Sequence, residues 1–297
     1  MPNGCYMENT KKSFKDKWEK NPDLVFSETL KPGSDIFSWI VKRNGLGDAE
    51  GLALFLKKSR RILDAGCGNG RLTALLREYS SPEQTEIIGI DLVSAQIARK
   101  NLAHYRNVTI YEKDLLGDLR DLGEFDFIYC QEVLHHTVAP EKAFQNLCNR
   151  LAAGGEIAIY VYKTKAPARE FVDDYVREKI SALPYDEAMK VCDQITELGR
   201  ALSRYQLKIA VPAVDILDIE KGEYDLQRFI YHFFMKCFWN PELSFQENAV
   251  INYDWYHPQT CSRHTVEEVR GWFMNAGLDI VHECVDFYGI TVRGKRK

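Results

Sequence analysis

The sequence of 297 residues lacks any long apolar run. No segment approaches the ~18 consecutive apolar residues that a membrane-spanning helix requires. The first twenty residues, MPNGCYMENTKKSFKDKWEK, are too polar for a secretory signal peptide. We therefore expect a soluble, cytoplasmic protein with no transmembrane segment.

An excess of positive charge is also missing. The chain has 39 Lys and Arg against 43 Asp and Glu, which gives a formal net charge of -4. Binding to a nucleic-acid backbone requires clustered cations. The basic residues 293–297 (RGKRK) fit a solvated tail. We therefore expect no nucleic-acid partner.

The eight cysteines lack the C-x-x-C spacing of zinc sites and redox pairs. They are scattered, and Cys130 lies in the apolar run FDFIYCQEVL. Buried, reduced thiols fit this pattern better than disulfides or a metal site. We therefore expect no metal.

Between residues 60 and 163, apolar strands alternate with amphipathic helices. The predicted strands are RRILDAGCG, TEIIGIDL, NVTIYEKDL, FDFIYCQEVL and EIAIYVYK. The predicted helices are GRLTALLREYS, VSAQIARKNLAHY and APEKAFQNLCNRLAAGG, the last one closed by its glycine pair. This alternation predicts a parallel, doubly wound sheet.

The alternation stops at Lys163, and residues 165–250 are expected to be mainly helical. A helix is predicted from Thr265 to Gly277, followed by two strands that form an antiparallel pair at the sheet edge. The expected fold is α/β: a doubly wound, mostly parallel seven-stranded sheet with an antiparallel edge strand. An N-terminal helical cap and a helical insertion between strands 5 and 6 complete it.

The predicted organisation has four segments. They are a helical cap (1–45), a Rossmann-like cofactor-binding core (46–163), a helical insertion or substrate lid (164–256), and a helix with two strands that complete the core (257–297).

The stretch 61–72, RILDAGCGNGRL, places glycine at alternate positions directly after a strand. A dinucleotide fingerprint reads G-x-G-x-x-G and carries a pyrophosphate at the helix N-terminus. Here Arg71 stands where the third glycine should be, and Asp64 would repel a pyrophosphate. Both departures argue against a dinucleotide and hence against a dehydrogenase.

The stretch ILDAGCGNG resembles the first motif of the class I methyltransferases, two hydrophobic residues followed by Asp/Glu-x-Gly-x-Gly-x-Gly. Their cofactor, S-adenosyl-L-methionine, has no phosphate but carries an ammonium, a carboxylate and a sulfonium. The resemblance implies that Asp64 attracts the ammonium, directly or through water, and that the glycines admit the nucleoside. The segment FDFIYCQEVLHH resembles the branch whose fourth motif is D-x-x-x-x-x-x-V-L-x-H.

The resemblance also implies contacts at the ends of the next strands. Asp91 is placed to accept hydrogen bonds from the ribose hydroxyls, and Asp114 lies beside the adenine amino group with the Leu115 amide next to it. Each of these acids could instead cap a helix or lie in solvent. The expected cofactor contacts are Asp64, Gly66, Cys67, Gly68, Asn69, Gly70, Asp91, Leu92, Asp114, Leu115 and Gln131.

Methyl transfer from a sulfonium is an in-line displacement that depends on alignment, with a base where the acceptor is protonated. His135 and His136 are the leading base candidates because they follow the fourth strand, and His257 is a third. Structural packing of each histidine is the alternative. Aromatic and cationic residues outside the glycine turn are expected to contact the acceptor: Trp18, Tyr160, Tyr162, Lys163, Arg169 and Tyr256.

The stretch YDWYHPQTCSRHTVEEVRGWFMNAGL resembles a segment of uncharacterised class I methyltransferases, several of them in bacterial glycan or natural-product gene clusters. The expected activity is therefore methyl transfer to a small organic acceptor, foremost an oxygen of a sugar-like or secondary metabolite. Alternatives left open are an RNA or protein methyltransferase, a non-catalytic partner subunit, and a carboxylated form of the cofactor. A homodimer through the helical insertion is also left open.

Overall fold

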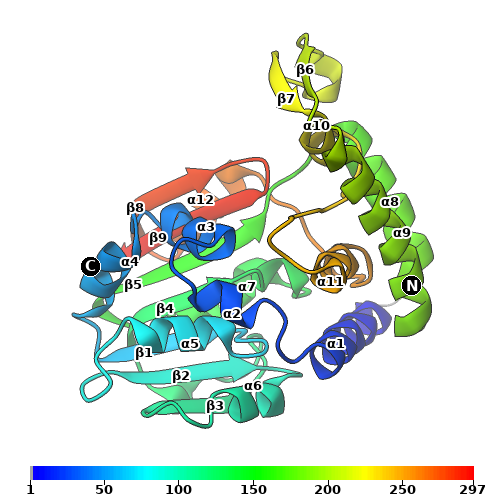
Figure 1. Ribbon diagram of the computed structural model, residues 1–297. Coiled ribbons are helices and arrows are strands. Elements are labelled where there is room, and N and C mark those ends of the chain that lie inside the picture. Colours follow the sequence, from blue (N-terminus) through cyan, green and yellow to red (C-terminus); the bar gives the residue numbers. More distant parts are fainter. Residues whose placement is uncertain (1–2) are drawn as a thin grey trace. The chain divides into compact units, whose positions relative to one another are not determined.

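The computed structural model describes residues 3–297, with side chains from Met7 onward (Figure 1). The chain forms two compact units. Unit 1 comprises residues 1–17 and 164–261, and unit 2 comprises residues 18–163 and 262–297.

These borders differ from the predicted ones at residues 45 and 256. The first residues of the chain belong with the insertion because helix α1 (Asn3–Lys20) is bonded to it. Lys17 forms an ion pair with Asp254 at 2.8 Å, and the Thr260 amide donates to Thr10 Oγ1 at 2.9 Å. The pattern of polar residues in the first helix did not predict these partners, which are distant in the sequence.

Unit 2 contains the seven-stranded sheet. Its strands are β1 (Arg61–Ala65), β2 (Glu86–Asp91), β3 (Val108–Glu112), β4 (Phe125–Gln131), β5 (Leu151–Tyr162), β8 (Leu278–Val285) and β9 (Gly289–Arg296). They are ordered β3-β2-β1-β4-β5-β9-β8, and β9 runs antiparallel to both β5 and β8. The predicted fold, mostly parallel with an antiparallel pair at one edge, is confirmed.

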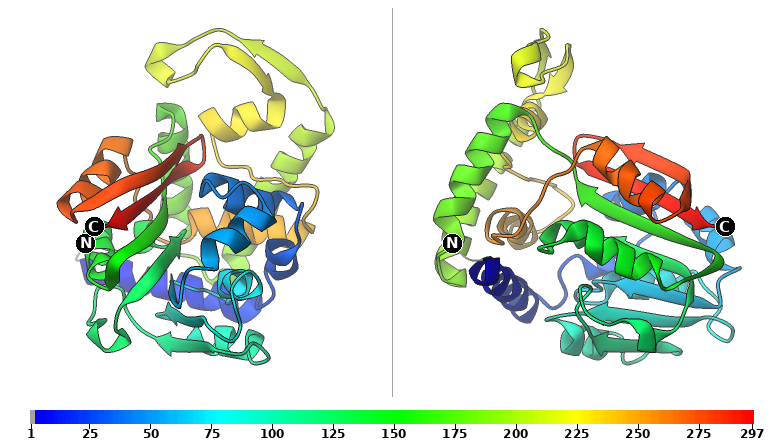
Figure 2. Two further views of the ribbon diagram at one scale, coloured as in Figure 1. Left: turned by 90° about the vertical axis from the view of Figure 1, so that its left-hand side faces the viewer. Right: turned by 180° about the vertical axis from the view of Figure 1, so that it is seen from behind.

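Helices cover both faces of this sheet (Figures 1 and 2). One face carries α3 (Asp35–Arg43), α4 (Ala49–Leu56), α5 (Arg71–Glu78) and α6 (Ala95–Asn101), with α2 (Phe26–Leu30) beside α5. The other carries α7 (Pro140–Cys148) and α12 (Val266–Asn275). Burial on both faces explains why the central strands are continuously apolar.

Helix α7 ends earlier than predicted. It stops at Cys148, and the stretch LAAGG forms the start of β5 instead of a helix end. Leu151 pairs with Phe125, and the register then shifts before Phe127 pairs with Glu156. Gly154 takes a positive φ of 73° there, so the glycine pair serves a strand irregularity rather than a helix cap.

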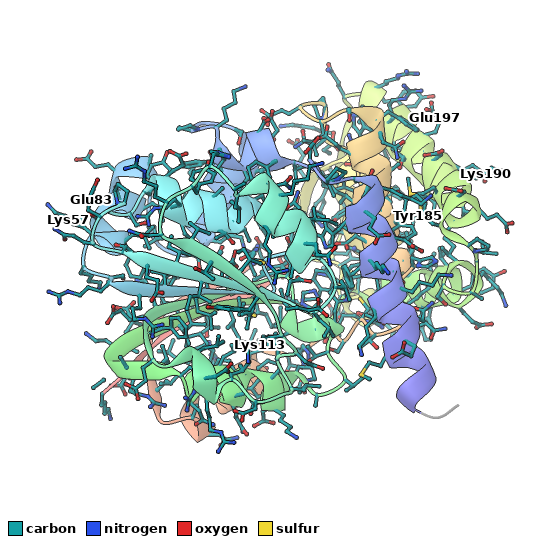
Figure 3. The ribbon with its side chains drawn as sticks, turned by 90° about the horizontal axis from the view of Figure 1, so that it is seen from below. Lys57, Glu83, Lys113, Tyr185, Lys190 and Glu197 are labelled. Atoms are coloured by element: carbon teal, nitrogen blue, oxygen red, sulfur yellow. The ribbon has the colours of Figure 1, made fainter. Side chains whose placement is uncertain are left out.

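Unit 1 is built mainly from helices α8 (Pro167–Ile180), α9 (Tyr185–Arg204), α10 (Leu226–Phe233) and α11 (Phe245–Tyr256). Figure 3 shows Lys190 and Glu197 on the outer side of α9, whereas Tyr185 at its start is buried. A small antiparallel pair, β6 (Lys208–Val211) and β7 (Gly222–Asp225), was not predicted. None of the helices in the described part of the chain is long and apolar enough to cross a membrane.

The N-terminus of α12 offers a test of local stability. Thr265 and Glu268 form a capping box, in which the Thr265 hydroxyl accepts from the Glu268 amide at 3.2 Å. We expect Thr265→Ala to lower the free energy of unfolding by about 1 kcal/mol, because the amide loses its acceptor. Thr265→Ser keeps the hydroxyl and should stay close to the parent in thermal and urea unfolding. Equal stability of the alanine variant and the parent would contradict the cap.

Candidate cofactor and active site

The turn between β1 and α5 can be built only from glycine at its key positions. Gly66, Gly68 and Gly70 have φ values of 82°, 58° and 91°, which disfavour other residues. A Cβ at Gly66 would lie 2.3 Å from Val133 Cγ2, and one at Gly68 would lie 2.8 Å from Trp18 Cζ2. The bare backbone therefore lies at the carboxyl end of β1, where ligands bind in α/β sheets.

Asp64 lies buried at the end of β1, with a relative exposure of 1%. Its Oδ2 accepts a hydrogen bond of 2.6 Å from Thr73 Oγ1, while Oδ1 has no hydrogen-bond partner among the described residues. Burial, with a contribution from the charge of Asp91, raises the pKa of Asp64 to about 7. A buried carboxylate oxygen without a donor is unfavourable unless a cationic ligand is bound.

Gln131 at the end of β4 supplies the complementary group. Its Oε1 accepts from the Tyr129 hydroxyl at 3.0 Å, and its Nε2 has no hydrogen-bond partner among the described residues. Strands β1 and β4 are neighbours, with Asp64 in register with Tyr129. The adjacent strand ends thus offer a buried acceptor and a buried donor, which match the ammonium and carboxylate of an α-amino acid.

Asp91 ends β2 and holds the glycine turn. Its Oδ2 accepts from the Gly68 amide at 3.0 Å, and its Oδ1 accepts from the Val93 and Ser94 amides at 2.9 Å each. A carboxylate has about four lone-pair sites, so one remains for a ligand hydroxyl. Leu92 follows it directly.

The other predicted cofactor contacts have protein partners of their own. Asp114 Oδ1 accepts from the Leu116 amide at 2.9 Å in the turn after β3, and Leu115 is buried. Asn69 Nδ2 donates to the carbonyls of residues 22 and 24, at 3.0 and 3.2 Å. The Cys67 thiol is buried, and this burial raises its pKa. Asn69 and Cys67 therefore have only backbone groups to offer a ligand.

The end of β4 brings His135 and His136 together with Tyr162 of β5. His135 is fully buried in the short helix η2 (Leu134–His136) and stacks on Tyr162, with 3.6 Å between ring centroids. His136 is half-buried, and its ring lies 5.7 Å from that of Tyr162. Tyr160 is buried between Trp39 and Arg43.

His264, which was not among the predicted site residues, also belongs to this group. The His264 amide donates to the Tyr162 carbonyl at 2.9 Å, and its Nε2 lies 2.8 Å from Ser262 Oγ. It also pairs with Lys163 in a β-bridge, and burial lowers its pKa. The signal was present, because His264 begins the HTVEEV stretch.

Arg71 and Glu132 form a further unpredicted pair. Arg71 Nη2 lies 3.3 Å from Glu132 Oε2, and Arg71 Nη1 donates to Thr29 Oγ1 at 2.9 Å. Glu132 has a positive φ of 60°, which is unusual outside glycine and often marks a functional turn. The ion pair joins the residue after the glycine turn to the residue after β4.

Three predicted site residues lie in unit 1 and are tightly bonded there. His257 Nε2 donates to the Leu183 carbonyl at 3.0 Å, and its Nδ1 lies 2.7 Å from Ser13 Oγ and 2.9 Å from Tyr253 Oη. Burial lowers its pKa. With both ring nitrogens engaged, a structural role is favoured for His257. Arg169 and Tyr256 are fully buried and bind the carboxylate of Asp173.

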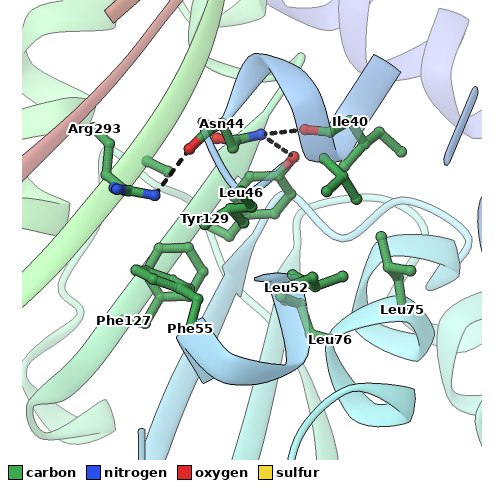
Figure 4. Close-up of a pocket in the computed structure, with 12 residues that line it drawn as sticks. Ile40, Asn44, Leu46, Leu52, Phe55, Leu75, Leu76, Phe127, Tyr129 and Arg293 are labelled. Carbon is green, nitrogen blue, oxygen red and sulfur yellow. Dashed lines mark hydrogen bonds between the residues drawn. The ribbon is translucent and has the colours of Figure 1, made fainter. Parts of the chain in front are cut away.

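Unit 2 also contains a small, mostly apolar cavity beneath α3 and α4 (Figure 4). Asn44 Nδ2 in its wall donates to the Ile40 carbonyl at 2.8 Å and to Tyr129 Oη at 3.2 Å. Arg293 Nη1 donates to the Asn44 carbonyl at 2.8 Å. This cavity is a gap in the packing rather than part of the glycine-turn site. Nor do the described side chains include a group of three or more His, Cys, Asp and Glu placed to hold a metal.

The fold and the glycine turn are typical of α/β proteins whose ligand combines a nucleoside with an α-amino acid. The family described as "Methyltransferase domain" matches residues 56–225, more than half of the chain. The chain therefore belongs to this family of methyltransferase domains.

Similar proteins were found at moderate identity. An uncharacterised protein of a Synechococcus strain is 36% identical over 112 residues, which cover 34% of this chain and 25% of that protein. The ubiquinone biosynthesis O-methyltransferase of Alkalilimnicola ehrlichii is 33% identical over 114 residues, 37% of this chain and 44% of the relative. The chain thus spans less than half the length of each.

Among solved structures, the N-methyltransferase NodS of Bradyrhizobium japonicum, in complex with S-adenosyl-L-homocysteine, superimposes with a TM-score of 0.43 at 14% identity. The match covers 87% of this chain and 91% of that one.

The residues of unit 2 fit S-adenosyl-L-methionine. Asp64 Oδ1 and Gln131 Nε2 are buried and have no hydrogen-bond partner among the described residues. Asp64 Oδ1 can accept from the ammonium of the cofactor, and Gln131 Nε2 can donate to its carboxylate. The glycine turn and Asp91 stand where the nucleoside would lie.

The first prediction from this site concerns the glycine turn. We expect Gly68→Ala to lower the affinity for S-adenosyl-L-homocysteine at least tenfold in calorimetry, because Cβ at a φ of 58° strains the turn and meets Trp18. Gly271→Ala on α12, where a Cβ meets nothing, is the matched control and should bind like the parent. Unchanged binding by the Gly68 variant would contradict the site.

The second prediction concerns pH. An ammonium favours the ionised form of Asp64, and the ionised fraction grows as the pH rises through its pKa of about 7. Affinity for S-adenosyl-L-homocysteine should therefore increase by up to about tenfold between pH 6 and pH 7.5. Asp64→Asn should bind more weakly and lose most of this pH dependence. An affinity that stays flat in the parent would argue against Asp64 as the ammonium partner.

Proposed function

We propose that this protein transfers a methyl group from S-adenosyl-L-methionine to an oxygen of a small organic acceptor, either sugar-like or a secondary metabolite. The observation that carries the proposal is the pair of buried, unpartnered atoms Asp64 Oδ1 and Gln131 Nε2 at adjacent strand ends. The name of the Alkalilimnicola relative, an O-methyltransferase, supports an oxygen as the acceptor atom.

In this proposal the residues of unit 2 divide the work of holding the cofactor. Asp64 binds the ammonium, Gln131 binds the carboxylate, and Asp91 accepts from a ribose hydroxyl. Asp114 and the Leu115 amide take the adenine. The bound cofactor supplies an electrophilic methyl group. The side chains then contribute alignment and exclusion of water, which are worth several orders of magnitude in rate.

His136 is the residue we assign to take the proton from the acceptor hydroxyl. It follows β4 and is half-buried, so its ring can meet both the site and a substrate. His135 stacks on Tyr162 and holds the short helix in place through its carbonyl, which accepts from the Ser262 amide at 2.8 Å. A histidine is suited to this role because its pKa lies near neutral pH.

Trp18, Tyr162 and Lys163 are the acceptor contacts that unit 2 contributes in this proposal. Trp18 lies against Gly68, and Tyr162 and Lys163 end β5 beside His135 and His264. Tyr160 is a weaker candidate, because Trp39 and Arg43 surround its ring.

The other expectations stay predictions. The net charge of -4 disfavours RNA as the acceptor, and the cytoplasmic location rests on the sequence alone. A homodimer would have a candidate surface on α8, where Phe171 and Tyr175 are 78% and 63% exposed. Sedimentation at several concentrations would test it.

The proposed activity can be tested without knowing the acceptor. A cell extract is separated by dialysis into small molecules and macromolecules, and each fraction is incubated with the enzyme and methyl-labelled cofactor. We expect label in the small-molecule fraction only, and at subsaturating cofactor we expect much less label with the Gly68→Ala variant. Label in RNA or protein would contradict a small-molecule acceptor.

The base is tested by substitution. We expect His136→Asn to lower turnover about a hundredfold, because the acceptor proton loses its base, with little change in affinity for S-adenosyl-L-homocysteine. His104→Asn, at an exposed histidine of the same unit, is the control and should keep full turnover. Unchanged turnover in the His136 variant would remove it from the mechanism.

A further inference from the structure

Unit 1 contains a group of buried cations. Lys165, Arg169, Arg177 and Lys236 have relative exposures of 8%, 1%, 7% and 6%, and each lies over the ring of Trp255 at 5.1 to 5.7 Å. Burying one cation is unfavourable, and burying several together is more so unless anions compensate them.

The buried carboxylate in this group is already fully occupied. Asp173 is the single buried carboxylate among the described side chains of unit 1. Its Oδ2 accepts from Arg169 Nε at 3.0 Å and Trp255 Nε1 at 2.8 Å. Its Oδ1 accepts from the Lys236 amide at 2.9 Å and Tyr256 Oη at 2.7 Å. With about four lone-pair sites per carboxylate, Asp173 has none left for another donor.

Among the described side chains of unit 1, Arg169, Arg177, Arg200 and Arg228 each keep a buried guanidinium N–H donor without a hydrogen-bond partner. Arg169 and Arg228 both lie over the ring of Tyr231, at 4.6 and 5.5 Å from its centroid. The Nη1 atom of each is buried and has no hydrogen-bond partner among the described residues. Arg169 is fully buried, whereas Arg228 is half-buried, so this pair extends from the interior of unit 1 toward its surface.

The pKa of His232 reflects the positive electrostatic potential beside Arg169 and Arg228. Its pKa is lowered to about 3, first by burial and then by the charges of Arg169, Arg228 and Lys165. A bound anion would offset these charges, so the local field favours a negative ligand.

We propose that Arg169 and Arg228 form a binding site for an anionic group, a carboxylate or a phosphate, of a small molecule. Guanidinium groups with free N–H donors are suited to these planar or tetrahedral anions. Both guanidinium groups lie over the ring of Tyr231, and the Nη1 donor of each has no partner among the described residues. The site lies entirely within unit 1 and goes beyond the proposed function, because anion binding here does not require methyl transfer.

The experiment is calorimetric titration of the full-length protein with inorganic phosphate and, separately, with benzoate, at constant ionic strength set by sodium chloride. We expect saturable binding of at least one probe. Binding of phosphate alone would assign a phosphate site, and binding of benzoate alone a carboxylate site. Saturable binding of neither probe would overturn the proposal.

Variants identify the residues. Arg228→Gln should weaken the binding about tenfold or more, because one charge-assisted donor is lost. Arg169→Gln should weaken the binding to a similar extent if the variant folds. If it does not fold, the half-buried Arg228 still tests the site, because Arg228→Gln is a less disruptive substitution. Arg204→Gln, at an exposed arginine of α9, is the matched control. Equal binding by Arg228→Gln and the control would overturn the assignment.

A second readout separates this site from the cofactor site. Anion binding should raise the pKa of His232, observed by NMR titration of its ring, since a bound negative charge offsets the nearby cations. Affinity for S-adenosyl-L-homocysteine is measured on the same samples and should be unchanged in Arg228→Gln. An unmoved His232 titration at saturating probe would contradict binding at this place, whatever the outcome for methyl transfer.

Discussion

The site at the carboxyl end of β1 depends on a buried carboxylate followed by a turn that only glycine adopts without strain. Asp64 loses its hydration at the end of β1 and recovers one hydrogen bond, from Thr73, within the protein. The remaining oxygen is left for a ligand, so the protein retains a local cost that a cation can offset. Such unfavourable positions are expected at functional sites, where the rest of the fold stabilises them.

The surrounding elements keep this arrangement in place. Asp91 binds the Gly68 amide and so ties the turn to the end of β2. Arg71 and Glu132 tie the start of α5 to the residue after β4. The acceptor of one strand end and the donor of the next are thereby held together before any ligand binds, which reduces the ordering that binding requires.

Much of this could be predicted from the sequence, because local patterns carry it. The alternation of strands and helices predicted the sheet. The spacing of Asp64 and the three glycines predicted the class of cofactor. The partners of these residues could not be predicted. Thr73, Tyr129 and His264 owe their roles to tertiary proximity, which leaves no periodic trace in the chain. Strands β6 and β7 were missed because each has four residues and buries little of its surface.

In unit 1, too, the partners of the charged residues could not be predicted from the sequence. The aromatic stretch around residues 226–239 indicated a packed helix, and α10 is one, but it ends at Phe233. Asp173, whose carboxylate binds Arg169, Trp255 and Tyr256, lies in α8 rather than in α10. Charges that look solvated along the sequence are buried together in the fold, which only the structure reveals.

The central claim is that Asp64 and Gln131 jointly hold the amino-acid end of the cofactor. Its most direct test is a crystal structure of the protein with S-adenosyl-L-homocysteine. We predict the ligand's ammonium within hydrogen-bonding reach of Asp64 Oδ1, directly or through one water, and its carboxylate within reach of Gln131 Nε2. A ligand bound elsewhere, or one that leaves both atoms without a partner, would contradict the account.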